Sequence, residues 1–313
     1  MRFIRLFERR IQTMMIKRGI TTALCTVVLA VLYMENQACG EKTSGVVEPG
    51  AQIRKLADGF GFSEGPASDS DGNVYFSDYG KDIIYRWSLN DSLSTVRKEI
   101  GGPIGLYFDP AGRLLICAAK SHRIKAVDTA GVMTEYPDTY HGKLLNSPND
   151  IWVDPKGGIY FTDPRFAPLK EKVEQDGYHV YYIPPGTTSI IRAADDLSRP
   201  NGIIGSPDGR LVYITDTPND KTFVYTVRED GTLSDKKIFA NEGYDGMTVD
   251  VEGNVYITMQ KSIEVYSPDG KKIDSISVPD KPTNVCFGGR DRKTLFITAR
   301  ISLYSLRMRV RGL

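Results

Sequence analysis

The chain has 313 residues, of which 41% are hydrophobic and 25% are charged, with a formal net charge of +1. This length and composition are typical of a folded globular protein with one large domain or two small ones. The near-neutral charge argues against a strongly basic binding surface, so we expect no nucleic-acid partner. The 30 glycines and 17 tyrosines favour β structure.

The first 39 residues have the pattern of an export signal. A basic stretch at 1–19 precedes "ITTALCTVVLAVLYM", an apolar run of 15 residues. Because about 20 apolar residues are needed to span a bilayer, this run predicts the hydrophobic part of a signal rather than a transmembrane helix. Cys39, at the end of "NQAC", is the site for a lipid anchor if the signal is of the lipoprotein type, with plain secretion as the alternative. We therefore expect a periplasmic or extracellular protein that touches a membrane only through that anchor, and a flexible tether at 40–50.

From residue 60 onward a turn followed by an alternating apolar run recurs six times. The runs are "DSDGNVYFSD", "DPAGRLLICA", "DPKGGIYFTD", "SPDGRLVYIT", "DVEGNVYITM" and a degenerate "GRDRKTLFIT". Their turn positions (72, 112, 157, 209, 253 and 292) are 40, 45, 52, 44 and 39 residues apart. Periods of this size, built only from short strands and tight turns, predict a β-propeller.

Each repeat is interpreted as four strands, except that the last has only three, "NVCFGG", "TLFITAR" and "SLYSLRM". The segment "AQIRKLADGF" at 51–60 would supply the missing outermost strand and close the ring. The prediction is an all-β, six-bladed β-propeller with four-stranded blades over 51–313. Cys117 and Cys286 lie in apolar strand-like runs and predict free thiols in the core rather than a disulfide.

One residue in each repeat stands at the same distance from the turn, at the start of the predicted innermost strand. Five of these six residues carry a carboxylate or an amide. Because innermost strands meet around the central channel of a propeller, we expect these side chains to converge at one mouth of it. Counting eight residues back from each turn position gives these axial positions in chain order as Glu64, Ile104, Asn149, Asn201, Asp245 and Asn284.

Two carboxylates and several amides in one confined space would repel, or leave polar atoms unpaired, without a cation. Oxygen ligands suit a hard cation, so Ca²⁺ is the first choice, with Zn²⁺, Mn²⁺ and Mg²⁺ as alternatives. The ring holds no histidine or cysteine, which argues against a zinc site of the usual kind. Any one of these residues could be a simple turn former, but their recurrence in one phase favours a shared site.

Other polar residues are expected on the same face. Asp78, Asp163 and Asp216 end the second strand of three repeats, and we expect them to accept hydrogen bonds from nearby loop amides. His141, Lys143 and Arg165 are predicted to contact substrate at the rim. The connection "PRFAPLKEKVEQDGY" at 164–178 is either a partial lid or a solvated loop.

Several blocks resemble the gluconolactonase and regucalcin family, of the senescence-marker type, over residues 60–305. These are "FSEGPASDSDGNVYFSD", "GKLLNSPNDIWVDPKGGIYFTDP", "RPNGIIGSPDGRLVYITDT", "DGMTVDVEGNVYIT" and "FGGRDRKTLFITA". The "GKLLNSPND" and "FTDP" blocks are most similar to bacterial and fungal gluconolactonases. The resemblance implies a six-bladed propeller that binds one divalent cation, often Ca²⁺, and hydrolyses sugar lactones.

The resemblance also implies roles for particular residues. Glu64 of "EGP", Asn201 of "PNG" and Asp245 of "DGM" match the family's metal ligands. Asn149 of "SPND" matches a residue beside the metal that contacts ligand or substrate. Ile104 departs from the pattern, because relatives often carry Asn there, and this leaves the identity of the sugar open.

The hypothesis for function is a metal-dependent lactonase in which water attacks the lactone carbonyl. Asp245 and Asp150 are the candidate bases, with Asn149 beside them. Two alternatives stay open: a phosphotriester or arylester hydrolase that uses the same cup, and an exported propeller that only binds a sugar or a protein. No GxSxG elbow or Cys/His pair supports a covalent mechanism. We expect a small sugar lactone as partner, and a monomer or weak dimer.

Overall fold

The computed structural model describes residues 45–166 and 172–313. The predicted signal, Cys39 and the first half of the predicted tether lie outside these residues. In the described part no helix is long and apolar enough to cross a membrane. Its regular structure is almost entirely strand, with two short 3-10 turns, η1 (Ala119–Ser121) and η2 (Thr217–Asn219).

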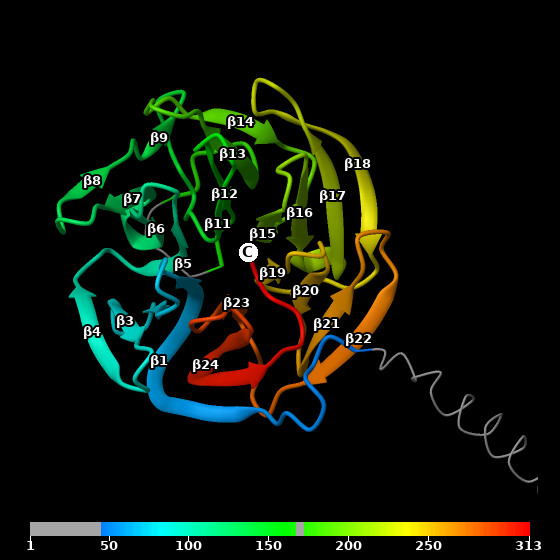
Figure 1. Ribbon diagram of the computed structural model, residues 1–313. Coiled ribbons are helices and arrows are strands. Elements are labelled where there is room, and N and C mark those ends of the chain that lie inside the picture. Colours follow the sequence, from blue (N-terminus) through cyan, green and yellow to red (C-terminus); the bar gives the residue numbers. More distant parts are fainter. Residues whose placement is uncertain (1–44, 167–171) are drawn as a thin grey trace, which may run out of the picture. The chain divides into compact units, whose positions relative to one another are not determined.

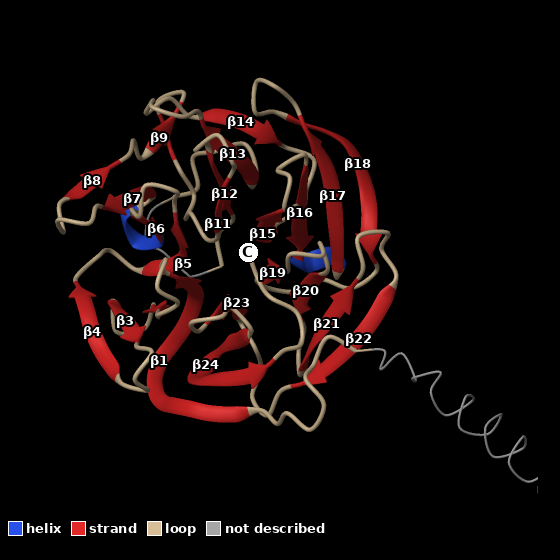
Figure 2. Cartoon of the chain, viewed as in Figure 1, coloured by secondary structure: helices blue, strands red, loops and turns tan. Residues whose placement is uncertain are grey.

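The strands form antiparallel sheets arranged around a common axis, as Figure 1 and Figure 2 show. Four sheets have four strands each in chain order, and a two-stranded ribbon is formed by β9 (Thr139–Tyr140) and β10 (Lys143–Leu144). A further sheet has six strands, in the order β23-β24-β1-β2-β3-β4. This arrangement confirms the prediction of an all-β, propeller-like fold.

In each four-stranded sheet the strands run outward from the axis in the order of the chain, and in the six-stranded sheet both β23 and the second half of β1 lie at the axis. The strands nearest the axis are β1 (Arg54–Ser68), β5 (Pro103–Phe108), β11 (Ile151–Val153), β15 (Pro200–Gly205), β19 (Met247–Val249) and β23 (Asn284–Gly288). The second strands are β2 (Val74–Asp78), β6 (Leu114–Ala118), β12 (Ile159–Asp163), β16 (Leu211–Asp216), β20 (Val255–Thr258) and β24 (Thr294–Arg307).

The outer strands follow the same order. The third strands are β3 (Ile83–Trp87), β7 (Arg123–Val127), β13 (His179–Ile183), β17 (Lys221–Val227) and β21 (Ser262–Tyr266). The outermost are β4 (Leu93–Lys98), β8 (Met133–Glu135), β14 (Ile191–Ala194), β18 (Leu233–Ala240) and β22 (Lys272–Ser277).

The repeated turn between the first and second strands has the backbone conformation that its glycine implies. The glycines at these turn positions have positive φ, from 69° at Gly209 to 98° at Gly72. That region is open to glycine and unfavourable for other residues. In the degenerate sixth repeat Arg292 takes the same conformation, with φ 57°, and its guanidinium bonds Ser68 and the carbonyl of Asp69.

Strand β1 joins the beginning of the described chain to its end. Its first half pairs with β24, from Arg54 opposite Ser305 to Asp58 opposite Ser302, and its second half pairs with β2. The segment predicted to close the ring therefore does so, as part of a longer strand. Val46, in the stretch predicted as tether, is buried against the same sheet and Val47 bridges to Met308.

The end of the chain differs from the prediction in one respect. The segments "TLFITAR" and "SLYSLRM" were expected to be separate strands, but they form the single strand β24. Arg300 interrupts it with a φ of 53°, and the N–H of Met308 donates to the carbonyl of Lys293, so the two halves run side by side. No turn residue such as Gly or Asn marks this bend, and the bend depends on Arg300 adopting a conformation that is rare for arginine.

The core lies between adjacent sheets and is rich in aromatic residues. Tyr160, Tyr181, Tyr213 and Tyr256, each on the second or third strand of its sheet, are completely buried. Such rings remove a large apolar area from water, so they account for much of the stability of the packed sheets. Cys117 and Cys286 are buried free thiols, as predicted.

Leu303 and Ile301 allow a test of the ring closure, because they lie on the same half of β24 and differ in burial. Leu303 is 0% exposed and packs against the first half of β1, whereas Ile301 is 53% exposed. We expect Leu303→Ala to lower the free energy of unfolding by about 2–4 kcal/mol through the cavity it leaves. The matched change Ile301→Ala should cost less than about 0.5 kcal/mol. Urea unfolding of both variants checks this, and equal losses would contradict the observed closure.

Candidate functional site

Six strands line the axis and hold the axial positions at one end. Strands β1, β5, β11, β15, β19 and β23 each contact the next, and β23 contacts β1. At this end a hydroxyl from the second strand of one sheet donates to the backbone carbonyl of the axial residue in the next sheet. These bonds run from Ser77 to Ile104 at 2.6 Å, from Thr162 to Asn201 at 2.7 Å and from Thr215 to Asp245 at 2.9 Å.

These hydroxyls were not singled out in the sequence, although the signal is present. Each stands one residue before the recurring aspartate, in "FSD", "FTD" and "ITD". In the sheet of β5 to β8 the corresponding residue is Cys117, and there the N–H of Gly105 donates to the carbonyl of Asn149 at 2.7 Å. Neighbouring sheets are therefore tied together at the residues whose side chains face the axis.

After four of the axial residues the neighbouring strands approach so closely that there is no room for a side chain, and the next residue is glycine. A Cβ on Gly65 would lie 2.1 Å from the carbonyl oxygen of Ile104, and one on Gly202 would lie 2.4 Å from that of Asp245. Such contacts do not occur between real atoms, so glycine is required for the strands to come this close. The close approach brings the axial side chains into one space.

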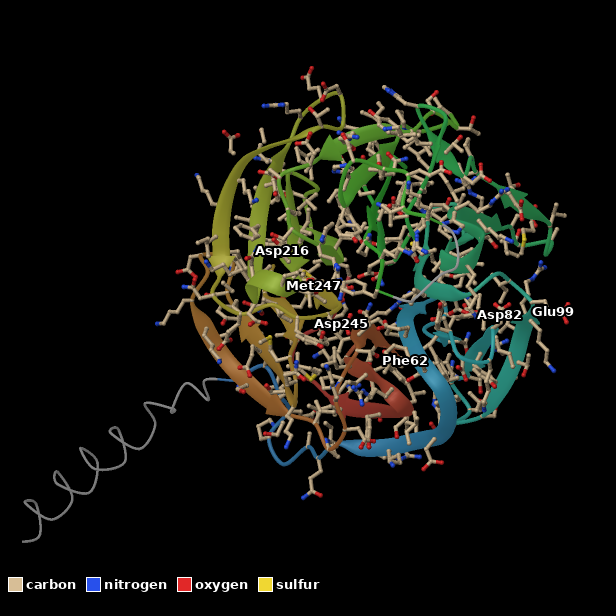
Figure 3. The ribbon with its side chains drawn as sticks, turned by 180° about the vertical axis from the view of Figure 1, so that it is seen from behind. Phe62, Asp82, Glu99, Asp216, Asp245 and Met247 are labelled. Carbon is tan, nitrogen blue, oxygen red and sulfur yellow. The ribbon has the colours of Figure 1, made fainter. Side chains whose placement is uncertain are left out.

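Four of the axial polar residues line a single cavity of about 350 Å³, and these are Glu64, Asn149, Asn201 and Asp245. Ile104 lines the same cavity, so the apolar member of the ring is also in place. Figure 3 shows this face of the molecule, with Asp245 and Phe62 near its middle. The structure thus brings together the four residues that the sequence predicted as a metal site.

The sixth axial residue, Asn284, does not line this cavity, although its side chain is hydrogen-bonded to that of Glu64. Asp150 lies next to Asn284. Both line a larger cavity of about 1000 Å³, which Leu313 also lines. Figure 1 views the molecule from the end of the axis where the C-terminus lies. The Nδ2 of Asn284 is 3.5 Å from Oδ2 of Asp150, and the N–H of Ile203 donates to the same oxygen at 3.2 Å. Asp150 therefore stands behind the cup formed by the other four.

The carboxylates on the axis raise one another's proton affinity. Burial raises the pKa of Glu64 well above its usual range, and the charges of Asp245 and Asp150 add to this. Loss of surrounding water raises the pKa of Asp245, and the charge of Asp150 raises it further. Burial raises the pKa of Asp150 to about 7. Three acids that resist ionisation in one place indicate that a positive charge would be bound there favourably.

Asn201 has a buried oxygen that nothing in the described protein satisfies. Its Nδ2 donates to Oδ1 of Asp245 at 2.9 Å and to the carbonyl of Tyr244 at 3.2 Å. Its Oδ1 is buried and has no hydrogen-bond partner among the described residues. A buried acceptor without a partner is costly, and next to two carboxylates it is the arrangement that a hard cation would satisfy. The residues present therefore fit a divalent cation.

Histidine, cysteine and acidic side chains do not make this site by themselves. No three of them come together within 45–166 and 172–313 in a way that could hold a metal ion. A cation in the cup would need the amide oxygen of Asn201 as well as Glu64 and Asp245.

The three predicted rim contacts are not among the residues that line the cavity. His141 and Lys143 are exposed on the β9–β10 ribbon, where the His141 ring stacks on Tyr140 with 4.1 Å between ring centroids. Arg165 precedes the undescribed residues 167–171. The sequence could not give the direction of the loops that carry these residues. The mouth is lined instead by Tyr79, Phe166, Tyr244, Lys281 and Arg300, with Phe62.

The second repeated set of aspartates has the structural role that was predicted. Asp78 accepts from the N–H groups of Gly61 and Phe62, and Asp216 accepts from those of Ser198 and Arg199. Each holds the loop that leads into an innermost strand.

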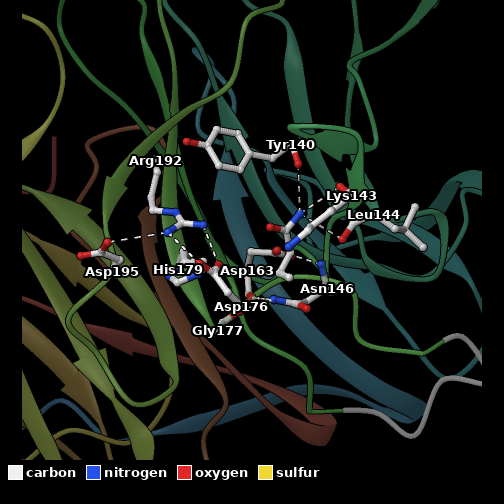
Figure 4. Close-up of polar contacts among 11 residues, drawn as sticks. Tyr140, Lys143, Leu144, Asn146, Asp163, Asp176, Gly177, His179, Arg192 and Asp195 are labelled. Atoms are coloured by element: carbon white, nitrogen blue, oxygen red, sulfur yellow. Dashed lines mark hydrogen bonds and ion pairs between the residues drawn. The ribbon is translucent and has the colours of Figure 1, made fainter.

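Asp163 plays the same part in the third sheet, within a polar network drawn in Figure 4. Its carboxylate accepts from the N–H groups of Asn146 and Ser147 at 2.8 and 2.7 Å. The segment 172–178, the longer of the two described parts of the predicted lid, is fastened nearby, since Gln175 donates to the carbonyl of Lys143 at 2.9 Å. In the same region the Nε2 of His179 lies 2.9 Å from Oδ1 of Asp176.

The class of protein follows from this geometry: a β-propeller with an oxygen-lined cup at one end of its axis. The model of the family described as SMP-30/Gluconolactonase/LRE-like region matches residues 62–301. The chain belongs to this family, and the resemblance seen in the sequence is confirmed.

Three relatives show how similar the chain is to known proteins. The gluconolactonase of Zymomonas mobilis is 28% identical over 306 residues, which cover 87% of this chain and 85% of that one. The 6-deoxy-6-sulfogluconolactonase of Pseudomonas putida is 36% identical over 163 residues, 48% of this chain and 53% of that one. The structure of XC5397, a gluconolactonase from Xanthomonas campestris, has a TM-score of 0.80 with 28% identity, and covers 86% of this chain and 93% of that one.

Asp163→Asn tests whether this aspartate acts by holding the loop. Both carboxylate oxygens accept an N–H, so an amide would turn one acceptor into a donor that faces another donor. We expect the free energy of unfolding to fall by about 1–3 kcal/mol, as for a buried hydrogen bond that cannot form. The control is Asp195→Asn, whose side chain is 62% exposed and pairs only loosely with Arg192. It should cost less than about 0.5 kcal/mol. Equal stability of the wild type and Asp163→Asn in chemical denaturation would contradict this role.

Proposed function

We propose that this protein is a metal-dependent hydrolase that opens sugar lactones. Its family contains proteins named gluconolactonase, and the observation that carries the proposal is the cup of Glu64, Asn201 and Asp245. The unsatisfied Oδ1 of Asn201 beside two carboxylates supports a divalent cation as the resident cofactor. Asn149 would lie beside the cation as a further ligand or as a contact to the substrate.

The donor set favours Ca²⁺, with Zn²⁺, Mn²⁺ and Mg²⁺ as alternatives to be tested. All donors are oxygens, and the two carboxylate charges of Glu64 and Asp245 match a dication. When bound, such a cation polarises a carbonyl and stabilises the negative charge that develops on its oxygen.

Asp245 is the better placed of the two candidate bases. It lines the cavity, its Oδ1 accepts from Asn201, and its Oδ2 accepts no hydrogen bond from the described residues. Oδ2 is therefore the atom available either to bind the cation or to take the proton of the attacking water. Asp150 has both oxygens engaged by backbone N–H groups, from Ile151 and Ile203, and lines the cavity behind. Its part would be to position Asn149 and to supply negative charge next to Asp245.

The walls of the cavity suit a sugar ring. Phe62, Tyr79, Phe166 and Tyr244 surround the mouth, and aromatic faces cover the apolar faces of carbohydrates while excluding water. The family relatives are named for lactones with different substituents, gluconolactone and its 6-deoxy-6-sulfo form. Family membership therefore supports lactone opening as the reaction. Which substituents the sugar carries would depend on the side chains that line this cavity.

We further infer six blades of four strands, with the six-stranded sheet divided at β1. The support is the pairing of β1, whose first half completes the sheet of β23 and β24 while its second half begins the sheet of β2 to β4. Six blades would give one axial position each. Export, to the periplasm or to the outside of the cell, is proposed from the sequence of residues 1–39.

The first test is hydrolysis itself. Protein stripped with a chelator should not accelerate the opening of D-glucono-1,5-lactone above its spontaneous rate, because the cup would lack its cation. Adding Ca²⁺, Zn²⁺, Mn²⁺ or Mg²⁺ should restore turnover, which a pH indicator follows through the acid released. The proposal fails if none of these ions gives turnover with any of a panel of aldonolactones.

The second test separates cation binding from folding. Glu64→Gln and Asp245→Asn keep the shape of each side chain and remove its charge. Each should abolish the rise in melting temperature that the activating ion causes in the wild type. In the wild type, an ion concentration of 100 times Kd adds about 2.7 kcal/mol to the free energy of unfolding. Each should also lower kcat/KM by at least about 10²-fold, because loss of a residue that only supports a metal ligand already costs about 10–100-fold. Glu229→Gln, at an exposed site, is the control and should behave as the wild type. An unchanged ion-dependent shift in both variants would remove these residues from the site.

A further inference from the structure

Two positive side chains line the mouth of the cavity that holds Glu64 and Asp245. Lys281 precedes β23, and Arg300 stands at the interruption of β24. Neither has a carboxylate within ion-pair distance among residues 45–166 and 172–313, although burial raises the pKa of Asp245 and the charge of Lys281 counteracts that rise. Unpaired cations are common on open surfaces, but these two face a cavity of about 350 Å³ that must receive the substrate.

Lys281 is held in place by an aromatic ring rather than by an acid. Its Nζ donates to the hydroxyl of Tyr244 at 2.6 Å and lies 3.9 Å from the centroid of that ring. The neighbouring acid, Asp280, is engaged by the hydroxyls of Ser302 and Tyr304 instead. The ammonium of Lys281 is half-buried and fixed, so it has lost part of its hydration. Binding of an anion there is favoured because the anion would replace the lost water.

Arg300 adopts an unfavourable backbone conformation that its own contacts do not explain. The other arginine with a positive φ, Arg292, bonds Ser68 and Asp69 through its guanidinium. Arg300 has a φ of 53°, pairs through its backbone with Ser63, and makes no side-chain hydrogen bond to the described residues. Backbone conformations of this kind persist at functional sites, where they aim a side chain. Here the residue is exposed and lines the cavity that also holds Glu64.

We propose that Lys281 and Arg300 form an anion subsite, and that the preferred substrate is a sugar lactone carrying a carboxylate, sulfonate or phosphate group remote from its carbonyl. The inference rests on the proposed lactonase activity. A cation in the cup would balance Glu64 and Asp245, so the two side-chain cations would stay unpaired against a neutral lactone. An arginine fork and a lysine ammonium together match the oxygens of all three anionic groups.

The experiment compares kcat/KM for D-glucono-1,5-lactone with that for the same ring bearing a 6-carboxylate, a 6-sulfonate or a 6-phosphate. The wild type should prefer at least one anionic lactone by about tenfold or more at low salt, with the preference falling as salt screens the pair. The three anionic lactones show which group the subsite takes.

Variants assign the preference to these side chains. Lys281→Met and Arg300→Asn should each reduce the ratio of anionic to neutral kcat/KM about five- to tenfold, as for loss of one partly screened charge. Lys281→Arg and Arg300→Lys keep the positive charge and should therefore keep most of the preference for the anionic lactone. The matched control is Lys236→Met: this lysine also lies over an aromatic ring, 4.4 Å from the centroid of Phe223, but it pairs with Asp196 and is outside the cavity lining.

The outcomes for the subsite and for the proposed function are distinguishable. Turnover of the neutral lactone at least as fast as that of all three anionic ones overturns the subsite and leaves the lactonase proposal standing. If no lactone is opened, the lactonase proposal fails, and calorimetry with glucose 6-phosphate, glucuronate and glucose decides on the subsite. Tighter binding of an anionic sugar, lost in the Lys281→Met and Arg300→Asn double variant, supports it; equal binding of all three sugars overturns it.

Discussion

The hydrogen bond from a strand-end hydroxyl to the carbonyl of the next axial residue is the contact on which the site depends. Thr162 and Thr215 tie their sheets to Asn201 and Asp245 through it, and glycines such as Gly202 allow the backbones to approach closely enough. Each bond runs from a side-chain hydroxyl to the backbone carbonyl of the axial residue, so it fixes where the axial side chain starts without using that side chain's functional atoms. The carboxylate and amide groups remain available for a ligand.

Such convergence has an electrostatic consequence. Glu64, Asp245 and Asp150 are brought near one another in surroundings with little water, and each has its pKa raised. The folded protein would be more stable if these acids were farther apart. Their closeness is therefore best explained by a site that binds a positive charge. The proposed cation answers that need in the cup. Lys281 and Arg300 add positive charge at the mouth, which argues for a substrate that brings a negative charge of its own.

Much of this could be predicted from the sequence, because both fold and site repeat. The turn glycines gave the period, and counting back from them identified Glu64, Asn149, Asn201 and Asp245, which the structure brings to one cavity. The positions of residues outside the repeat were harder to predict. His141 and Lys143 were predicted at the rim from their positions along the chain, but they are exposed on the β9–β10 ribbon and do not line the cavity. Lys281 and Arg300 follow no repeated pattern, so only the folded chain shows that they line the same cavity.

The central claim is that side chains from separate sheets hold a single divalent ion in the cup. Anomalous diffraction from crystals grown with Mn²⁺ or Ca²⁺ tests it most directly, because the signal locates the ion without reference to any mechanism. The account predicts one strong peak within bonding distance of oxygens of Glu64, Asn201 and Asp245, at about 2.0–2.6 Å. An ion bound elsewhere at saturating concentration, or a cup that holds none, would contradict it.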